Sequence, residues 1–97
     1  HAIEIPMQVA RLSMQAMQVA QEMAASGNPN SITDAGVGAM AIRTGVKGAI
    51  LNARVNLADL EDDQFAAKTK EECAQMWREV EELESAVLMR VDEVLGA

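Results

Sequence analysis

The sequence predicts an all-α fold, an up-down bundle of three long helices that forms part of a larger helical domain. Three observations support this prediction. Apolar residues recur at steps of three and four through most of the 97 residues. Residues that stop and start helices divide the chain into three such stretches. No segment alternates apolar and polar residues for long enough to indicate a strand.

The first helix is expected from about Ile5 to just before Gly27. Its apolar residues form two adjoining stripes, Ile5, Val9, Leu12, Ala16, Val19, Met23 and Met7, Ala10, Met14, Met17, Ala24. Most of its circumference therefore needs to be covered. Pro6 suits a first turn, and Gly27 suits a left-handed cap that ends the helix.

The second helix is expected from about Ile32 to Leu57, starting near Ser31. Ser31 and Asp34 have the spacing of a capping box. Apolar side chains point in nearly every direction around this helix, so we expect it to be central and mostly buried. Its four glycines, with three alanines, form a ridge of small residues that allows a neighbouring backbone to approach closely: Gly36, Gly38, Ala41, Gly45, Gly48, Ala49 and Ala53.

The third helix is expected to begin after a cap at Asp62 or Asp63. From Thr69 to Val94 its apolar residues repeat at threes and fours, and its opposite face is charged. About thirty residues at the usual rise give a helix of roughly 45 Å. This pattern is typical of an amphipathic helix on the outside of a bundle.

Three helices cannot cover all of this apolar surface, because each buries only its inward stripe in a bundle. We therefore expect further helices to pack here, from an upstream segment, from a second copy in a homodimer, or from both. The chain begins with His1 rather than methionine, which favours a piece of a longer protein.

Composition excludes several classes of function. Fifteen acidic and eight basic residues give a net charge of −7, and Phe65 and Trp77 are the only aromatic residues, so nucleic acid is not an expected partner. No apolar stretch is long enough for a membrane span. One cysteine, Cys73, and one histidine, His1, provide neither a disulfide nor a metal site. We expect a cytoplasmic protein without metal or cofactor.

Charge is unevenly distributed along the chain. Residues 1–58 contain three acidic and four basic residues, whereas residues 59–97 contain twelve acidic and four basic residues. An anionic ligand should therefore prefer the first part.

Polar residues share the small-residue face of the second helix. Steps of three and four connect Asp34 through the glycines to Asn52 and Asn56. One interpretation is that the two amides bond to the backbone of a neighbouring helix, because buried amides need partners. The other is that a ligand occupies the space that the glycines leave open.

Two further groups of polar residues also have a structural and a functional interpretation. Asn28, Asn30, Ser31 and Asp34 form either a loop with a helix cap or part of a binding site. The bases of the second helix form either a solvated edge or a site for carboxylates: Arg43, Lys47 and Arg54.

Two strings carry a resemblance to a known family. They are G-N-P-N-S-I-T-D-A-G-V-G at 27–38 and G-A-I-L-N-A-R-V-N-L at 48–57. In order and spacing they resemble the cyclodeaminase/cyclohydrolase family. This family includes the C-terminal domain of formimidoyltransferase-cyclodeaminase and stand-alone methenyltetrahydrofolate cyclohydrolases. By this resemblance, residues 1–97 are the C-terminal half of a helical, dimeric domain whose upstream half carries a glycine-rich loop at the folate site.

The resemblance implies a folate substrate and a reaction. In the cyclodeaminase reaction, N10 of 5-formimidoyltetrahydrofolate attacks the formimidoyl carbon and ammonia leaves, giving 5,10-methenyltetrahydrofolate. Asp34 is then the candidate for proton transfer or for holding the pterin. The candidates for substrate binding are Asn28, Asn30, Ser31, Asn52, Asn56 and Arg54, with Arg43 and Lys47 as further contacts to glutamate carboxylates.

Two other functions remain open at this point. A methenyltetrahydrofolate cyclohydrolase adds water to the same one-carbon bridge. A non-catalytic helical oligomerisation module is an alternative of a different class. An intact glycine-rich upstream segment would favour an enzyme.

Overall fold

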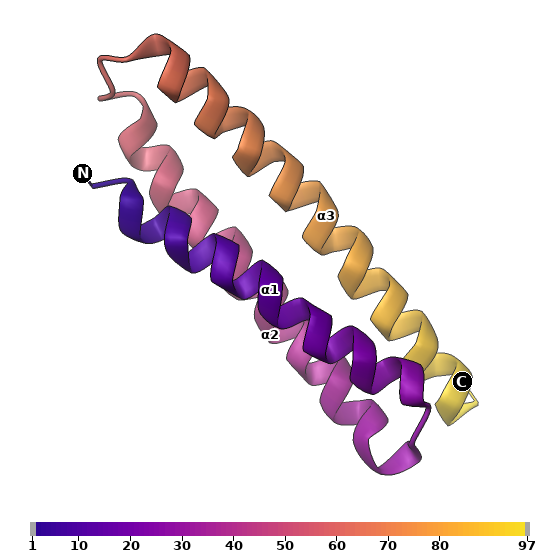
Figure 1. Cartoon of the computed structure of the whole chain (residues 1–97). Coiled ribbons are helices and arrows are strands. Elements are labelled where there is room, and N and C mark those ends of the chain that lie inside the picture. The colour runs from indigo at the N-terminus through magenta and orange to yellow at the C-terminus, as the bar shows by residue number, and fades with distance from the viewer. Residues whose placement is uncertain (1, 97) are drawn as a thin grey trace.

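The structure is a computed structural model that describes residues 2–96, so His1 lies outside the described residues. It contains three helices, α1 (Glu4–Ser26), α2 (Pro29–Leu57) and α3 (Asp63–Leu95), and no strand between residues 2 and 96. Consecutive helices run antiparallel, with the N-terminus near the α2–α3 turn and the C-terminus near the α1–α2 turn (Figure 1). The bundle measures 52 × 18 × 16 Å. The prediction of three long helices is confirmed.

Two helix ends are those that the sequence predicted. Gly27 adopts the left-handed conformation, with φ of 68°, and its N–H donates to the Ala24 carbonyl at 3.1 Å. Asp62 caps α3 because its Oδ1 accepts the N–H of Phe65 at 3.0 Å. Both ends depend on residues adjacent in sequence, which is why local reasoning found them.

The predicted start of α2 at Ser31 is wrong, because the helix begins at Pro29 with Asn28 as its cap. Asn28 precedes a proline and is extended, and its Oδ1 accepts the N–H of Asn30 at 2.9 Å. Pro29 occupies the first helical position, where its missing N–H costs nothing. The capping box does not form: the Ser31 hydroxyl donates to the Asn28 carbonyl, and Asp34 is exposed.

The core uses only one of the two apolar stripes of α1. The stripe rich in methionine and alanine faces α2 and α3, and its buried members are Met7, Ala10, Met17, Ala20 and Ala24. The other stripe is largely exposed: Ile5 is 70% exposed and Leu12 63%. Small alanines bring α1 close to α2, while larger side chains such as Ile32, Val46 and Val80 fill the centre.

The prediction that α2 is mostly buried is wrong for this chain. The helix is central in that it contacts both α1 and α3. However, Val55 is 74% exposed, Val37 62% and Leu51 50%. One side of α2 is buried and the other is free of neighbours within the described residues, because both partner helices lie on one side of it.

The predicted small-residue ridge packs against the other helices at some positions and is open at others. A Cβ placed on Gly38 or Gly48 would meet no atom within 4 Å. Gly36 does allow a close approach, since a Cβ there would lie 3.2 Å from Val91 Cγ2 of α3. A Cβ on Gly45 would lie 3.6 Å from Ser13 Oγ of α1, and Ala49 and Ala53 are buried. The packing predicted for the ridge is therefore confirmed at these three positions and at Gly36, and it is wrong at Gly38 and Gly48.

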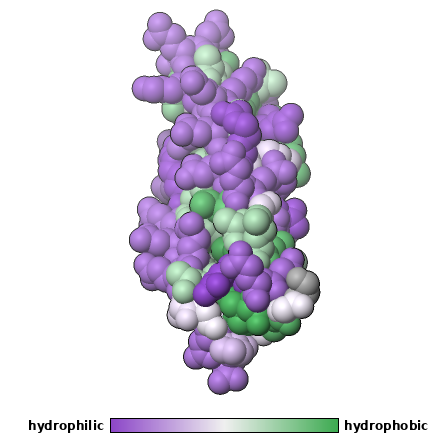
Figure 2. Space-filling model, turned by 90° about the vertical axis from the view of Figure 1, so that its right-hand side faces the viewer, coloured by the Kyte–Doolittle hydropathy of each residue, from purple (hydrophilic) through white to green (hydrophobic). Residues whose placement is uncertain are grey.

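The surplus apolar surface that the sequence predicted lies on α1 and α2. Its largest members on these helices are Ile5, Val9, Leu12, Val19, Val37, Met40, Leu51 and Val55. The side of the molecule in Figure 2 is mainly hydrophilic, and hydrophobic residues gather toward the end that carries the α1–α2 turn. Within residues 2–96, no helix is both long and apolar enough to cross a membrane.

Candidate functional site

The residues predicted to bind or react lie mainly on the free side of α2. Asp34 is in the second turn of the helix; it is exposed and makes no hydrogen bond to the rest of the described chain. Asn30 is exposed in the first turn, and its backbone N–H is held by the Asn28 side chain. Asn28 therefore has a structural role as the cap, whereas the Asp34 carboxylate remains available to a ligand.

Asn52 and Asn56 lie near the other end of the same face. The Asn56 side-chain amide donates to the carbonyl of Asn52 at 3.2 Å, within its own helix. Asn52 is exposed. Within the described residues, neither amide bonds to the backbone of a neighbouring helix.

The structure does not bring the two ends of this face together. Asp34 and Asn52 are eighteen residues apart on one continuous helix. At 1.5 Å per residue, about 27 Å separates them along the helix axis. A single ring system therefore cannot contact both residues of one chain.

The bases of α2 lie on another side of the helix, toward α3. Arg43 pairs with Glu84 of α3, and Lys47 pairs with Glu81 at 3.2 Å. Arg54 is two residues from both Asn52 and Asn56, which places it about 200° around the helix from each. The structure thus separates Arg54 from the two asparagines, and ion pairs occupy the other two bases.

Comparison with known proteins identifies the family. The family model described as formiminotransferase-cyclodeaminase matches residues 1–75. The chain belongs to the formiminotransferase-cyclodeaminase family. Both resembling strings fall inside the matched residues, so the resemblance read from them is confirmed.

Curated relatives of the family agree with this assignment. The chain is 34% identical over 87 residues to formimidoyltransferase-cyclodeaminase of Rattus norvegicus, covering 90% of the chain and 16% of the relative. It is 33% identical over 95 residues to the Dictyostelium discoideum protein of that name, covering 98% and 17%. It is also 34% identical over 71 residues to methenyltetrahydrofolate cyclohydrolase of Methylorubrum extorquens, covering 73% and 34%. The chain thus spans between about a sixth and a third of these relatives. No solved structure matches it.

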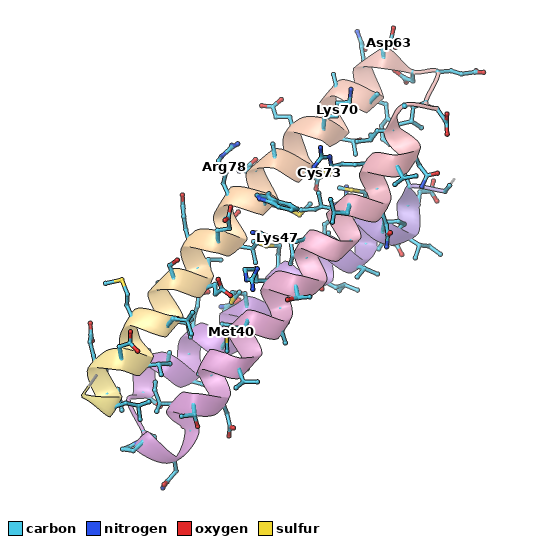
Figure 3. The ribbon with its side chains drawn as sticks, turned by 180° about the vertical axis from the view of Figure 1, so that it is seen from behind. Met40, Lys47, Asp63, Lys70, Cys73 and Arg78 are labelled. Carbon is cyan, nitrogen blue, oxygen red and sulfur yellow. The ribbon has the colours of Figure 1, made fainter. Side chains whose placement is uncertain are left out.

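A groove between α2 and α3 was missed by the sequence reasoning. It has a volume of about 660 Å³, and its lining includes Ile50, Leu57, Cys73 and Ala74. Arg54 of α2 and Lys70 and Arg78 of α3 border it, together with the Trp77 ring. In Figure 3, Lys70 and Cys73 lie on α3 beside α2, and Arg78 points away from α2 at the outer rim.

The spacing of α3 contains a signal for this groove. Residues 84, 81, 77, 74 and 70 follow steps of three and four and form the edge of α3 that lies along α2. The first two are glutamates, whereas Trp77, Ala74 and Lys70 follow. The change from acidic residues to an aromatic and a basic residue marks where the ion pairs end and the groove begins.

Two residues of α3 that contact α1, Glu72 and Cys73, have shifted pKa values. The guanidinium of Arg11 donates to both carboxylate oxygens of Glu72 at 2.8 Å, and this hydrogen bonding lowers the pKa of Glu72 and raises that of Arg11. Burial raises the pKa of the Cys73 thiol, which contacts the Met7 sulfur at 3.6 Å. The thiol therefore stays protonated and unreactive at neutral pH. In the described part of the chain, no three acidic, histidine or cysteine residues are grouped as a metal site.

Proposed function

We propose that the protein catalyses the cyclisation of 5-formimidoyltetrahydrofolate to 5,10-methenyltetrahydrofolate with release of ammonia. The observation that carries this proposal is the family match over residues 1–75, together with relatives named for this activity. Because the chain spans only 16–17% of those relatives, the activity is proposed for the full-length gene product.

The reaction needs a proton for the departing nitrogen and a fixed orientation of the pterin ring. In this proposal, Asp34 supplies or holds the proton, with Asn30 and Ser31 beside it in the first turn of α2. The exposure of Asp34 and its lack of an intramolecular partner support this role. Asn28 contributes by fixing the start of the helix that carries these groups.

A homodimer would explain how the distant ends of α2 serve one site. The residues of the free face pair symmetrically about Gly45, with Asp34 and Gly38 on one side and Asn56 and Asn52 on the other. If two copies of α2 pack antiparallel through this face, Asp34 of one copy lies beside Asn56 of the other. Small residues allow such close packing, and exposed Val37, Leu51 and Val55 would be buried by it.

A test supplies 5-formimidoyltetrahydrofolate to the full-length protein and follows the near-ultraviolet absorbance of the methenyl product. Asp34→Asn and Asn52→Ala should each lower turnover by about tenfold or more. Asp59→Asn is the matched control, because this exposed carboxylate lies beyond the end of α2. Wild-type turnover in Asp34→Asn, with an unchanged helical spectrum, would refute the role of Asp34.

Cyclohydrolase activity is the second candidate, supported by the Methylorubrum extorquens relative. A parallel assay therefore supplies preformed methenyltetrahydrofolate. Falling absorbance in that assay alone would identify a cyclohydrolase. No change in either assay, from a folded protein, would favour a non-catalytic helical module.

A further inference from the structure

We propose that the groove between α2 and α3 is a binding site for a ring-bearing organic anion with two or more acidic groups. The groove lies on the side of α2 opposite Asn52 and Asn56, so it is distinct from the face assigned to the folate reaction. The inference therefore does not rest on the proposed function.

The charge around the groove is the first argument. Ion pairs occupy Arg11, Arg43, Lys47 and Arg90. Among the residues that the structure describes, Arg54, Lys68, Lys70 and Arg78 have no carboxylate within 4.0 Å. Three of these four unpaired bases border one groove, in a chain whose net charge is −7.

Electrostatic repulsion makes this grouping of three unpaired bases unfavourable when no ligand is bound. The edge of α3 that supplies Glu84 to Arg43 and Glu81 to Lys47 continues to Lys70, which borders the same groove as Arg54. Like charges that share a groove repel one another, and an anion that enters between them removes this repulsion and accepts hydrogen bonds from them. Arg54 and Lys70 are thus the principal contacts, with Arg78 at the rim.

The walls of the groove specify the rest of the ligand. Ile50 and Leu57 are 1% and 4% exposed and form part of an apolar lining. The Trp77 ring borders the groove, and Lys47 lies over this ring with its nitrogen 4.5 Å from the centroid. A volume of about 660 Å³ falls in the range of small-molecule sites. A planar ring therefore suits this lining, while its acidic groups reach the bases.

The chain carries its own reporter for a binding test, because Trp77 is the only tryptophan and there is no tyrosine. Adenosine diphosphate and benzene-1,3,5-tricarboxylate are titrated separately while Trp77 fluorescence is followed. Adenosine supplies a ring without charge, and sulfate supplies charge without a ring. We expect one or both ring-bearing anions to change the fluorescence saturably, at concentrations where adenosine and sulfate do not.

Variants connect the signal to the groove. Arg54→Gln and Lys70→Gln should each weaken binding by about tenfold, the usual effect of losing one charge-assisted hydrogen bond. Lys68→Gln is the matched control, because this unpaired base on α3 borders a different depression, beside Phe65. It should change the dissociation constant less than about twofold, the small effect of one distant exposed charge.

The outcomes separate the chemistry of the ligand from the existence of the site. Binding of the diphosphate alone assigns a phosphate ligand, and binding of the tricarboxylate alone assigns a carboxylate ligand. No saturable response to either probe up to millimolar concentration would overturn the proposal. Equal weakening by the Lys68, Lys70 and Arg54 variants would also overturn it, because only general attraction by the net charge would remain.

Discussion

Replacing Gly48 by alanine should stabilise this chain. Gly48 is an exposed residue in the interior of α2, and a Cβ there would meet no atom within 4 Å. Glycine in a helix interior costs about 1 kcal/mol relative to alanine, because it loses more backbone freedom on folding. Since the new methyl group causes no clash, Gly48→Ala should raise the free energy of unfolding by about 1 kcal/mol.

Gly36→Ala is the matched control, because it makes the same change in the same helix. A Cβ on Gly36 would lie 3.2 Å from Val91 Cγ2 and 3.5 Å from Leu88 Cδ2. Gly36 is buried, so the Val91 side chain must give way by a few tenths of an ångström to accept the methyl group. Crowding of a packed core typically costs about 1–3 kcal/mol, which removes the gain in helix propensity.

The assay is urea unfolding of the 97-residue chain, followed by far-ultraviolet circular dichroism at low protein concentration. The midpoint for Gly48→Ala should rise with an unchanged slope, and the midpoint for Gly36→Ala should not. A loss of stability in Gly48→Ala as large as that in Gly36→Ala would refute the reasoning. It would mean that the free face of α2 is packed even in the dilute chain.

The same substitution tests the function of this face in the full-length protein. If a ligand or a second copy packs against the small residues of α2, the methyl group on Gly48 obstructs it. Gly48→Ala should then be more stable and less active than the wild type. Turnover at the wild-type level would exclude this part of the face from the reaction.

Three further predictions concern the rest of the bundle. Gly27→Ala should lower the free energy of unfolding by about 1 kcal/mol in a urea titration, because Gly27 has a φ of 68°; wild-type stability would contradict this role of the cap. Val46→Ala should cost about 2 kcal/mol, because the side chain is fully buried, whereas Val55→Ala, 74% exposed, should cost nothing measurable; equal effects would contradict the burial pattern. The Arg11 hydrogen bonds lower the pKa of Glu72 below 4.5. The Glu72 carboxylate therefore contributes to the free energy of unfolding above that pH, and this contribution is lost as pH falls through the folded pKa. The stability difference between wild type and Glu72→Gln should therefore shrink between pH 7 and pH 3, and a difference independent of pH would show that the carboxylate charge does not stabilise the fold.

The accuracy of the sequence reasoning depended on how local each feature is. Gly27 and Asp62 end and start helices through bonds to residues at most three positions away, so the sequence located both. The start of α2 was misplaced because Asn28 and Ser31 are both good caps, and the choice depended on Pro29. The family was also readable, since its two strings are contiguous in sequence.

Contacts between helices decided what the sequence left open. Both stripes of α1 are apolar, and only packing against α2 and α3 determined that the stripe with Met17 is buried and the stripe with Leu12 is exposed. Periodicity put Asp34 and Asn52 on one face, but only the unbroken length of α2 placed them about 27 Å apart.

The sequence by itself determined three helices, two of their ends and the family, because backbone hydrogen bonding and short motifs are local. The tertiary structure decided which faces are buried and which charges meet. From the sequence alone, Arg54 is not distinguished from the other bases of α2. It borders a groove with Lys70 only because α3 folds back along α2. Residues sixteen positions apart line one groove through packing, and no local pattern specifies that arrangement.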